Sequence, residues 1–213
     1  MLLFEMVAGH KNWGWLSEEA APWDILSRKT NSGLIGIVTD LVKKEVEASQ
    51  KFPDVDVSRG PVFIHEGVKI GTNVRIEGPV YVEEGAEIRH GAYLRPGTYL
   101  CNDCVVGHSS EVKNTLMMPR SKAPHFNYVG DSIIGVNVNL GAGAKISNVR
   151  LDRRTVPIQI PNIPKIDSGL RKLGAMIGDS TEIGCNVVTN PGAVIPPLSA
   201  VPPNTVVTGY WDH

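Results

Sequence analysis

Aliphatic side chains recur every six residues along the middle of this chain. Nine such positions follow one another without a miss: Ile64, Ile70, Ile76, Val82, Ile88, Leu94, Leu100, Val106 and Val112. A small or β-branched residue stands two positions before each of them, from Val62 to Ser110. Neither a helical period of 3.6 nor simple strand alternation produces this spacing. A period of six predicts short strands with two inward side chains each, separated by corners.

Three such strands close one triangular coil of about eighteen residues, and successive coils stack at about the 4.8 Å spacing of neighbouring β-strands. A single coil has no core, so the repeat has to continue if the fold is to be stable. It resumes over residues 132–146 and again over residues 175–201. The pattern therefore predicts a mainly β fold, a parallel β-solenoid domain over residues 57–213.

Residues 1–56 do not follow the period and are predicted to form an N-terminal helical segment. Ser17, ahead of Pro22, predicts a short capped helix. A stripe from Leu34 to Val46 predicts a second helix that ends near Gln50. This segment is expected to pack on the solenoid, to contact a neighbouring subunit, or to cap the open end of the coil.

The period is interrupted twice. After Val112, Met118 fits a tenth position, but the next good anchor, Tyr128, comes ten residues later rather than six, which predicts that four extra residues bulge outward around Pro119 to His125. Residues 147–173 are too many and too polar for a coil, so an insertion in the form of a projecting loop or hairpin is expected there. Segments that leave a rigid scaffold often carry function.

Composition narrows the functional classes. The formal net charge of −1 and the isoelectric point near 6.6 give no global field for nucleic acid or an anionic membrane surface. No apolar run approaches the roughly 18 residues of a spanning helix, and the first residues lack the features of a secretory signal. Three cysteines are too few for a disulfide framework, which favours a reducing, cytoplasmic location.

The Cys101 and Cys104 pair has the C-x-x-C spacing of metal or redox sites. The six-residue phase places Cys104 on an inward position and Cys101 at a corner. The two thiols are therefore not expected to point at one ion.

Arg95 and Lys113 each follow an inward anchor and are eighteen residues apart, so they are predicted to stack on adjacent coils. Two stacked cations repel each other unless an anion lies between them. A phosphate monoester suits such a pair. The alternative is that both side chains point outward and form solvated ion pairs beside Glu87 or Glu111.

His125 lies where the period breaks rather than on an inward row. Histidine is the side chain suited to general-base chemistry near neutral pH, so His125 is the candidate base. A purely structural role is the alternative. His90 and His108 are eighteen residues apart and should stack, which raises the further alternative of a metal site.

Six stretches in register carry a resemblance to a known family: LRPG at 94–97, EVKN at 111–114, HFNYVGD at 125–131, NVNLGAG at 137–143, SNVRLD at 147–152 and SGLRKLGAMIGD at 168–179. Together with the six-residue repeat they resemble the left-handed parallel β-helix of the hexapeptide-repeat acyltransferases. They are most similar to the acetyltransferase domain of the bifunctional UDP-N-acetylglucosamine pyrophosphorylases and to archaeal-type sugar-1-phosphate nucleotidylyltransferases.

The resemblance implies catalytic, substrate-binding and cofactor-binding residues. It makes His125 the general base and Asn148 an asparagine near the reacting amine. The implied substrate ligands are Arg95, Lys113, Tyr128 and Asn139. The implied acetyl-CoA side consists of Gly141, Ala142 and Cys185. A homotrimer with sites between subunits is also implied, with no metal, no nucleic acid and no membrane.

Two departures from the family pattern qualify these expectations. Residues 1–56 contain no G-x-G-T-R run, so nucleotidyl transfer is not expected. Arg154 and Pro157 stand where archaeal-type relatives tend to carry lysines. The leading hypothesis is an acetyl-CoA-dependent N-acetyltransferase acting on an amino-sugar-1-phosphate such as glucosamine-1-phosphate.

Two alternatives to this hypothesis stay open. One is a non-catalytic trimer that binds a sugar phosphate or a nucleotide sugar. The other is a relative of the γ-type carbonic anhydrases, which the sequence favours less because neither His65 nor His125 gives the H-x4-H spacing typical of that group.

Overall fold

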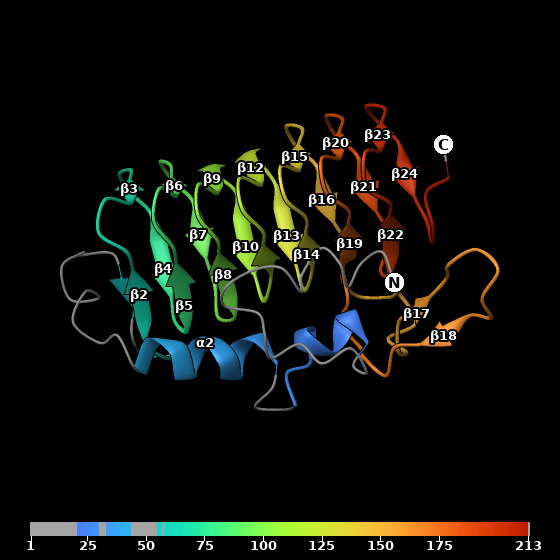
Figure 1. The fold of residues 1–213 in the computed structure, drawn as a ribbon, viewed down its shortest axis with the longest axis horizontal. Helices are drawn as coiled ribbons and strands as arrows, with labels where there is room; N and C mark the ends of the chain where they lie inside the picture. Colours follow the sequence, from blue (N-terminus) through green and yellow to red (C-terminus); the bar gives the residue numbers. More distant parts are fainter. Residues whose placement is uncertain (1–20, 30–32, 44–54, 57, 213) are drawn as a thin grey trace.

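The computed structural model describes residues 21–29, 33–43, 55–56 and 58–212. Their framework is a left-handed parallel β-helix made of three sheets, as predicted from the six-residue period (Figure 1). The chain visits the sheets in a fixed order, so each sheet receives one strand from every coil. This arrangement turns one linear repeat into three parallel columns of strands.

Sheet A contains β1 (Val55–Asp56), β4 (Arg75–Glu77), β7 (Tyr93–Leu94), β10 (Glu111–Lys113), β13 (Tyr128–Gly130), β16 (Lys145–Ile146), β21 (Val188–Thr189) and β24 (Val206–Val207). Sheet B contains β2 (Val62–Ile64), β5 (Val80–Val82), β8 (Thr98–Leu100), β11 (Leu116–Met117), β14 (Ile133–Ile134), β19 (Ala175–Ile177) and β22 (Ala193–Ile195). Sheet C contains β3 (Lys69–Ile70), β6 (Glu87–Ile88), β9 (Val105–His108), β12 (Lys122–His125), β15 (Asn139–Leu140), β20 (Glu182–Ile183) and β23 (Ala200–Val201).

The predicted inward positions form the core. Leu94, Leu100, Val106 and Val112 are fully buried. Each pairs with its counterpart one coil away, as Leu94 does with Val112. Stacking buries these side chains against equivalents above and below, which explains why the repeat tolerates so few polar substitutions at the inward slots.

The predicted bulge around Pro119 to His125 is wrong. Met117 pairs with Leu100 and Ala123 pairs with Val106, so both are inward anchors and the coil continues without extra residues. Val129, which is buried, and not Tyr128 is the next anchor. The period slips because the corner between sheets A and B becomes one residue shorter after Val112, and a six-residue count then lands on Met118.

The described part of the N-terminal segment, residues 21–29 and 33–43, lies along the outer face of sheet B (Figure 1). It contains η1 (Pro22–Leu26), a 3₁₀ helix, and α2 (Leu34–Lys43). Helix α2 buries Leu34, Val38 and Val42, one side chain per turn, and it contacts β5 and β8. The described helices therefore cover a flank of the solenoid. The predicted cap at Ser17 lies outside the described residues.

Between β16 and β19 the chain leaves the coil and forms an antiparallel hairpin, β17 (Pro157–Ile158) with β18 (Ile166–Asp167) (Figure 1). Val156 and Ile158 are buried at its base, whereas Ile163 near its tip is exposed. The chain then returns to sheet B at Ala175. No helix among the described residues is long and apolar enough to cross a membrane.

Shortening one inward side chain should weaken the whole stack. We expect Leu94→Ala to lower the free energy of unfolding by about 2 to 5 kcal/mol, because the neighbouring coils cannot collapse onto the cavity. Leu151→Ala is the matched control, since that side chain is fully exposed, and it should change the thermal midpoint little. Equal midpoints for both variants by differential scanning calorimetry would contradict the inward assignment.

Candidate active site

The corners between sheet A and sheet B stack into a column of polar residues. Gly97, Asn114, Asp131 and Asn148 occupy equivalent corners on four successive coils, and we call them the corner column. Gly97 has a φ of +83°, and a Cβ there would lie 2.7 Å from Oδ1 of Asn114. Asn114 and Asp131 adopt left-handed conformations themselves, with φ of +46° and +51°. The shortened corners thus bring polar side chains directly above one another.

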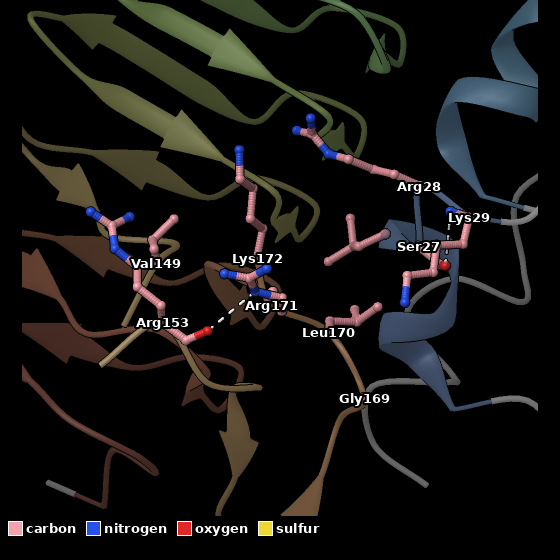
Figure 2. Close-up of a pocket in the computed structure, with 10 residues that line it drawn as sticks. Ser27, Arg28, Lys29, Val149, Arg153, Gly169, Leu170, Arg171 and Lys172 are labelled. Atoms are coloured by element: carbon pink, nitrogen blue, oxygen red, sulfur yellow. Dashed lines mark hydrogen bonds between the residues drawn. The ribbon is translucent and has the colours of Figure 1, made fainter. Parts of the chain in front are cut away.

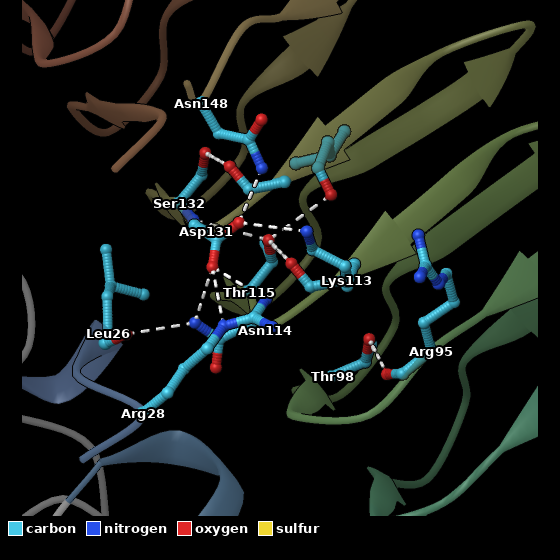
Figure 3. Close-up of polar contacts among 12 residues, drawn as sticks. Leu26, Arg28, Arg95, Thr98, Lys113, Asn114, Thr115, Asp131, Ser132 and Asn148 are labelled. Atoms are coloured by element: carbon cyan, nitrogen blue, oxygen red, sulfur yellow. Dashed lines mark hydrogen bonds and ion pairs between the residues drawn. The ribbon is translucent and has the colours of Figure 1, made fainter. Parts of the chain in front are cut away.

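Asp131 is the centre of the column (Figure 3). Its carboxylate is fully buried and accepts hydrogen bonds from Asn114 Nδ2 at 2.9 Å and from Asn148 Nδ2 at 2.5 Å. It also pairs with Lys113 Nζ at 3.2 Å and with Arg28 Nη2 at 2.8 Å. A fully buried carboxylate is costly unless its charge is compensated and its oxygens accept hydrogen bonds. Two cations and two amide groups do this for Asp131.

The network changes the proton affinity of its neighbours. Burial lowers the pKa of Lys113, against the attraction of Asp131, and the positive charges of Arg28 and Lys172 lower it further. Burial also raises the pKa of the Tyr128 phenol, with the charge of Asp131 as a second cause. At neutral pH the phenol therefore keeps its proton, and the charge of Asp131 favours the charged form of Lys113.

Tyr128 and Asn148 meet at the column. Asn148 Nδ2 donates to the Tyr128 hydroxyl at 3.2 Å, and Asn148 is buried. Lys113 and Tyr128 stand on neighbouring strands, β10 and β13. The structure thus brings together three of the expected site residues, Lys113, Tyr128 and Asn148.

Arg95 lies one coil away, at the end of β7, and is half-buried. Its Nη1 donates to Glu111 at 2.6 Å, so one of the two anticipated alternatives, an ion pair beside Glu111, is present. Burial is the largest single influence and opposes the charge of Arg95, but the hydrogen bond and the charge of Glu111, together with Tyr93 and Tyr128, raise its pKa overall. Its Nε is buried and finds no acceptor among the described residues, which leaves a donor for a ligand.

The other expected residues lie on sheet C. His125 ends β12, Asn139 begins β15, Gly141 and Ala142 follow that strand, and Cys185 follows β20. His125 is exposed, and its imidazole has no hydrogen-bond partner within the described part of the chain. Asn139 Nδ2 donates to Glu182 at 3.1 Å, and the Cys185 thiol is free and exposed. The site residues therefore divide into one group on sheet A and one on sheet C.

Most backbone N–H groups of residues 139–143, next to the expected acetyl-CoA side, already have acceptors. The N–H groups of Asn139 and Gly141 donate to carbonyls of the next coil, and that of Gly143 donates to the carbonyl of His125. Ala142 is half-buried, and its N–H makes no hydrogen bond to any described residue. Ala142 is thus the backbone donor that remains for a ligand.

The geometry of the described residues supports neither a metal site at His90 and His108 nor metal or redox chemistry at Cys101 and Cys104. His90 and His108 stack as predicted, with ring centroids 5.3 Å apart, but His108 then contacts Phe126 rather than a third histidine. Among the described residues no cluster of His, Cys, Asp or Glu has the arrangement of a metal site. Cys101 and Cys104 are buried, and burial raises the pKa of the Cys104 thiol to about 12.

Sequence reasoning missed two members of the network. Arg28 is 103 residues from Asp131, in a segment outside the repeat, so no spacing rule connects them. Asn114 also donates to the carbonyl of Leu26 at 3.0 Å and thereby anchors η1 to the column. The signal that could have pointed to Asp131 was the shortened spacing itself, because it marks the corners where the polar residues stack.

Known proteins show clear similarity to this chain. A family model described as the GMPPB C-terminal domain matches residues 76–197. A protein named bifunctional protein GlmU from Methanococcus maripaludis is 38% identical over 194 residues, which cover 91% of this chain and 45% of that protein. The bifunctional sugar-1-phosphate nucleotidylyltransferase/acetyltransferase of Sulfurisphaera tokodaii is 38% identical over 202 residues, covering 93% of this chain and 48% of that protein.

A third relative, an uncharacterized acetyltransferase named YaiX from Escherichia coli, is 36% identical over 153 residues, covering 72% of this chain and 66% of that protein. The chain thus spans about half the length of the first two relatives. The similarity covers the solenoid and the corner column alike.

Removing the central charge should be far more damaging than breaking a surface pair. We expect Asp131→Asn to lower the free energy of unfolding by about 3 to 5 kcal/mol, since Lys113 and Arg28 then lose their buried counterion. Arg150→Gln, which breaks the exposed pair with Asp152, is the control and should leave the thermal midpoint nearly unchanged. Similar midpoints for the two variants would mean that the column does not stabilise the fold.

Proposed function

Because the chain belongs to the family of the GMPPB C-terminal domain, we propose that it is an acetyl-CoA-dependent N-acetyltransferase acting on an amino-sugar-1-phosphate. The name of the Sulfurisphaera tokodaii relative, which combines sugar-1-phosphate nucleotidylyltransferase and acetyltransferase, supports the sugar phosphate and the acetyl group. The observation that carries the proposal is the convergence of Lys113, Tyr128 and Asn148 on Asp131. It offers a cation, a phenol and an amide on one surface, which is what a sugar phosphate needs.

In this proposal Arg95 and Lys113 bind the phosphate. Arg95 keeps a free Nε donor, and Lys113 contributes a compact charge on the next coil. The Tyr128 hydroxyl stays protonated because burial raises its pKa, so it can hydrogen-bond a sugar oxygen in either direction. Asn148 is held by Asp131 and Tyr128, which fixes its carbonyl for contact with the amine.

The chemical step is amide formation between the amine and the acetyl carbonyl. His125 accepts the proton that the amine loses as its nitrogen bonds to the carbonyl carbon. The free N–H of Ala142 is the donor available to the oxygen that gains negative charge. As the carbonyl re-forms, the carbon–sulfur bond breaks and the thiolate leaves, taking a proton to give the CoA thiol.

The division of residues between two sheets favours a homotrimer. Sheets A and C are different sides of the coil, so one chain presents the phosphate-binding group and His125 on different faces. In a cyclic trimer, sheet C of one copy would face sheet A of the next through a heterologous interface. Each of three sites would then combine residues from two chains.

The non-catalytic binding trimer is the second candidate. The exposed His125 imidazole has no acidic residue to orient it within the described residues, whereas general bases are usually oriented by a hydrogen bond. A partner chain in the trimer could supply that group. The two candidates share the sugar-phosphate pocket and differ only in turnover.

The histidine test separates the two candidates. If His125 is the base, His125→Ala should lower acetyl transfer by about 10² to 10⁴ while affinity for glucosamine-1-phosphate stays nearly unchanged. Transfer is measured as thiol release from acetyl-CoA, and affinity by calorimetry. His65→Ala is the matched control, because His65 is also exposed but follows β2 of sheet B. Sugar-phosphate binding without thiol release by the wild type would favour the binding trimer.

Subunit complementation tests the shared site. His125→Ala breaks the sheet C half and Arg95→Ala breaks the sheet A half, so each variant alone should be nearly inactive. A mixed trimer made by co-expression should regain one intact site, and the mixture should therefore recover roughly a third of wild-type activity per mixed trimer. Light scattering confirms the trimer. Absence of any recovery in confirmed mixed trimers would place the whole site within one chain.

A further inference from the structure

A basic cleft lies between the N-terminal segment and the insertion (Figure 2). Five of the side chains that line it are cationic: Arg28, Lys29, Arg153, Arg171 and Lys172. Two come from the residues that follow η1, and three come from the start and the end of the insertion. The volume of about 360 Å³ is in the range of about 300 to 1,000 Å³ typical of small-molecule sites.

None of the described residues that line this cleft is acidic. Two arginines on the coil are paired with carboxylates, Arg89 with Glu87 and Arg95 with Glu111. In contrast, Arg153 and Arg171 form no ion pair with any residue that the structure describes. Arg171 Nε donates to the carbonyl of Arg153 at 3.2 Å, which holds one guanidinium beside the backbone of the other residue. Clustered cations with free donors attract a multiply charged anion.

The cleft adjoins the corner column. Arg28 lines the cleft and also pairs with Asp131, so one side chain is shared by both. Val149, in the cleft wall, directly follows Asn148 in sequence, and the N–H of Leu173 donates to the carbonyl of Asn148 at 3.0 Å. A ligand that reached from the column past Asn148 would therefore enter the cleft.

We propose that the basic cleft binds the diphosphate of a nucleoside-diphosphate-linked sugar. This inference rests on the proposed function for the sugar, but the diphosphate site itself does not depend on acetyl transfer. Two adjacent phosphates fit the arrangement of Lys29, Arg153, Arg171 and Lys172 better than one, since these four cations lie outside the Asp131 ion pairs. The sugar would then lie on the column side and the nucleoside on the far side, and this ligand would be distinct from the sugar-1-phosphate acceptor, whose phosphate is assigned to Arg95 and Lys113.

The remaining wall of the cleft suits a nucleoside. Leu26, Val149 and Leu170 are apolar members of the lining, and Leu26 is buried beneath it. Ribose and base carry apolar surface that such side chains cover, whereas inorganic phosphate would leave them unused. Coenzyme A also carries a diphosphate. Its expected position at Gly141, Ala142 and Cys185 is on sheet C of the same chain, so coenzyme A is included among the probes to test whether the diphosphate bound in the cleft is that of the cofactor.

Calorimetry with the full chain tests the site. The probes are UDP, GDP, inorganic diphosphate, inorganic phosphate and coenzyme A. The Arg153→Gln/Arg171→Gln double variant removes two exposed charges, and Arg154→Gln is the matched control, because Arg154 is an exposed neighbour outside the cleft. We expect the double variant to weaken binding of UDP or GDP by at least about tenfold per arginine. The control should bind them as the wild type does, and all three proteins should have similar thermal midpoints.

Three outcomes would overturn the assignment. The first is wild-type affinity of the double variant for UDP and GDP. The second is wild-type binding of inorganic phosphate as tight as that of inorganic diphosphate. The third is weaker binding of coenzyme A alone by the double variant, which would show that the cleft binds the cofactor instead.

The acetyl-transfer assay keeps this test apart from that of the proposed function. In one outcome, the double variant transfers acetyl to glucosamine-1-phosphate and binds nucleoside diphosphates as the wild type does. This outcome rejects the diphosphate site in the cleft but not the proposed transferase activity. Nucleoside diphosphate binding that depends on the two arginines, without thiol release by the wild type, supports the cleft and rejects the transferase.

Discussion

The buried carboxylate of Asp131 joins parts of the chain that otherwise have no common framework. It accepts hydrogen bonds from corners one coil above and one coil below, and it pairs with Arg28 from the segment before the solenoid. Without these partners the buried carboxylate would be an uncompensated charge, which costs several kcal/mol. The N-terminal segment, the coil corners and the start of the insertion are therefore positioned by one charge.

The same charge sets the electrostatics of the surface around it. Arg28 and Lys113 together exceed the single negative charge of Asp131, and Lys172 adds to the excess, since its charge contributes to lowering the pKa of Lys113. The Asp131 carboxylate thus reduces the repulsion among these three cations, and the group as a whole still carries a net positive charge. A phosphorylated ligand would meet a surface that is positive but already ordered, so less side-chain freedom is lost on binding.

The sequence predicted the coil because the coil follows from periodicity, whereas Tyr128 and Asn148 became candidates only through the family resemblance. Inward rows repeat at six, and eighteen-residue arithmetic correctly placed His90 over His108. The sequence did not reveal which residue is the inward anchor after the shortened corner. Met117 and Met118 are both apolar, so either satisfies the hydrophobic pattern, and the same holds for Tyr128 and Val129. Only strand pairing distinguishes them.

The six-residue period could not predict the ion pair between Arg28 and Asp131. It depends on where the N-terminal segment packs, and this follows from burial of Leu34, Val38 and Val42 against sheet B rather than from a motif. Contacts between a repeat and a segment outside it have no fixed spacing along the chain. The pairing with Asp131 therefore became visible only in three dimensions.

A β-helix also limits how an active site can be completed. Strands inside the stack are hydrogen-bonded on both sides, as β10 is to β7 and β13, so sheets A and C cannot rotate toward each other. Closure by a hinge within the coil would break these ladders. Residues on the two sheets can share a ligand only if the ligand spans a corner or if another chain supplies the opposite wall. The short reach of a sugar phosphate favours the second route, and the same rigidity would hold the two walls in register once the chains associate.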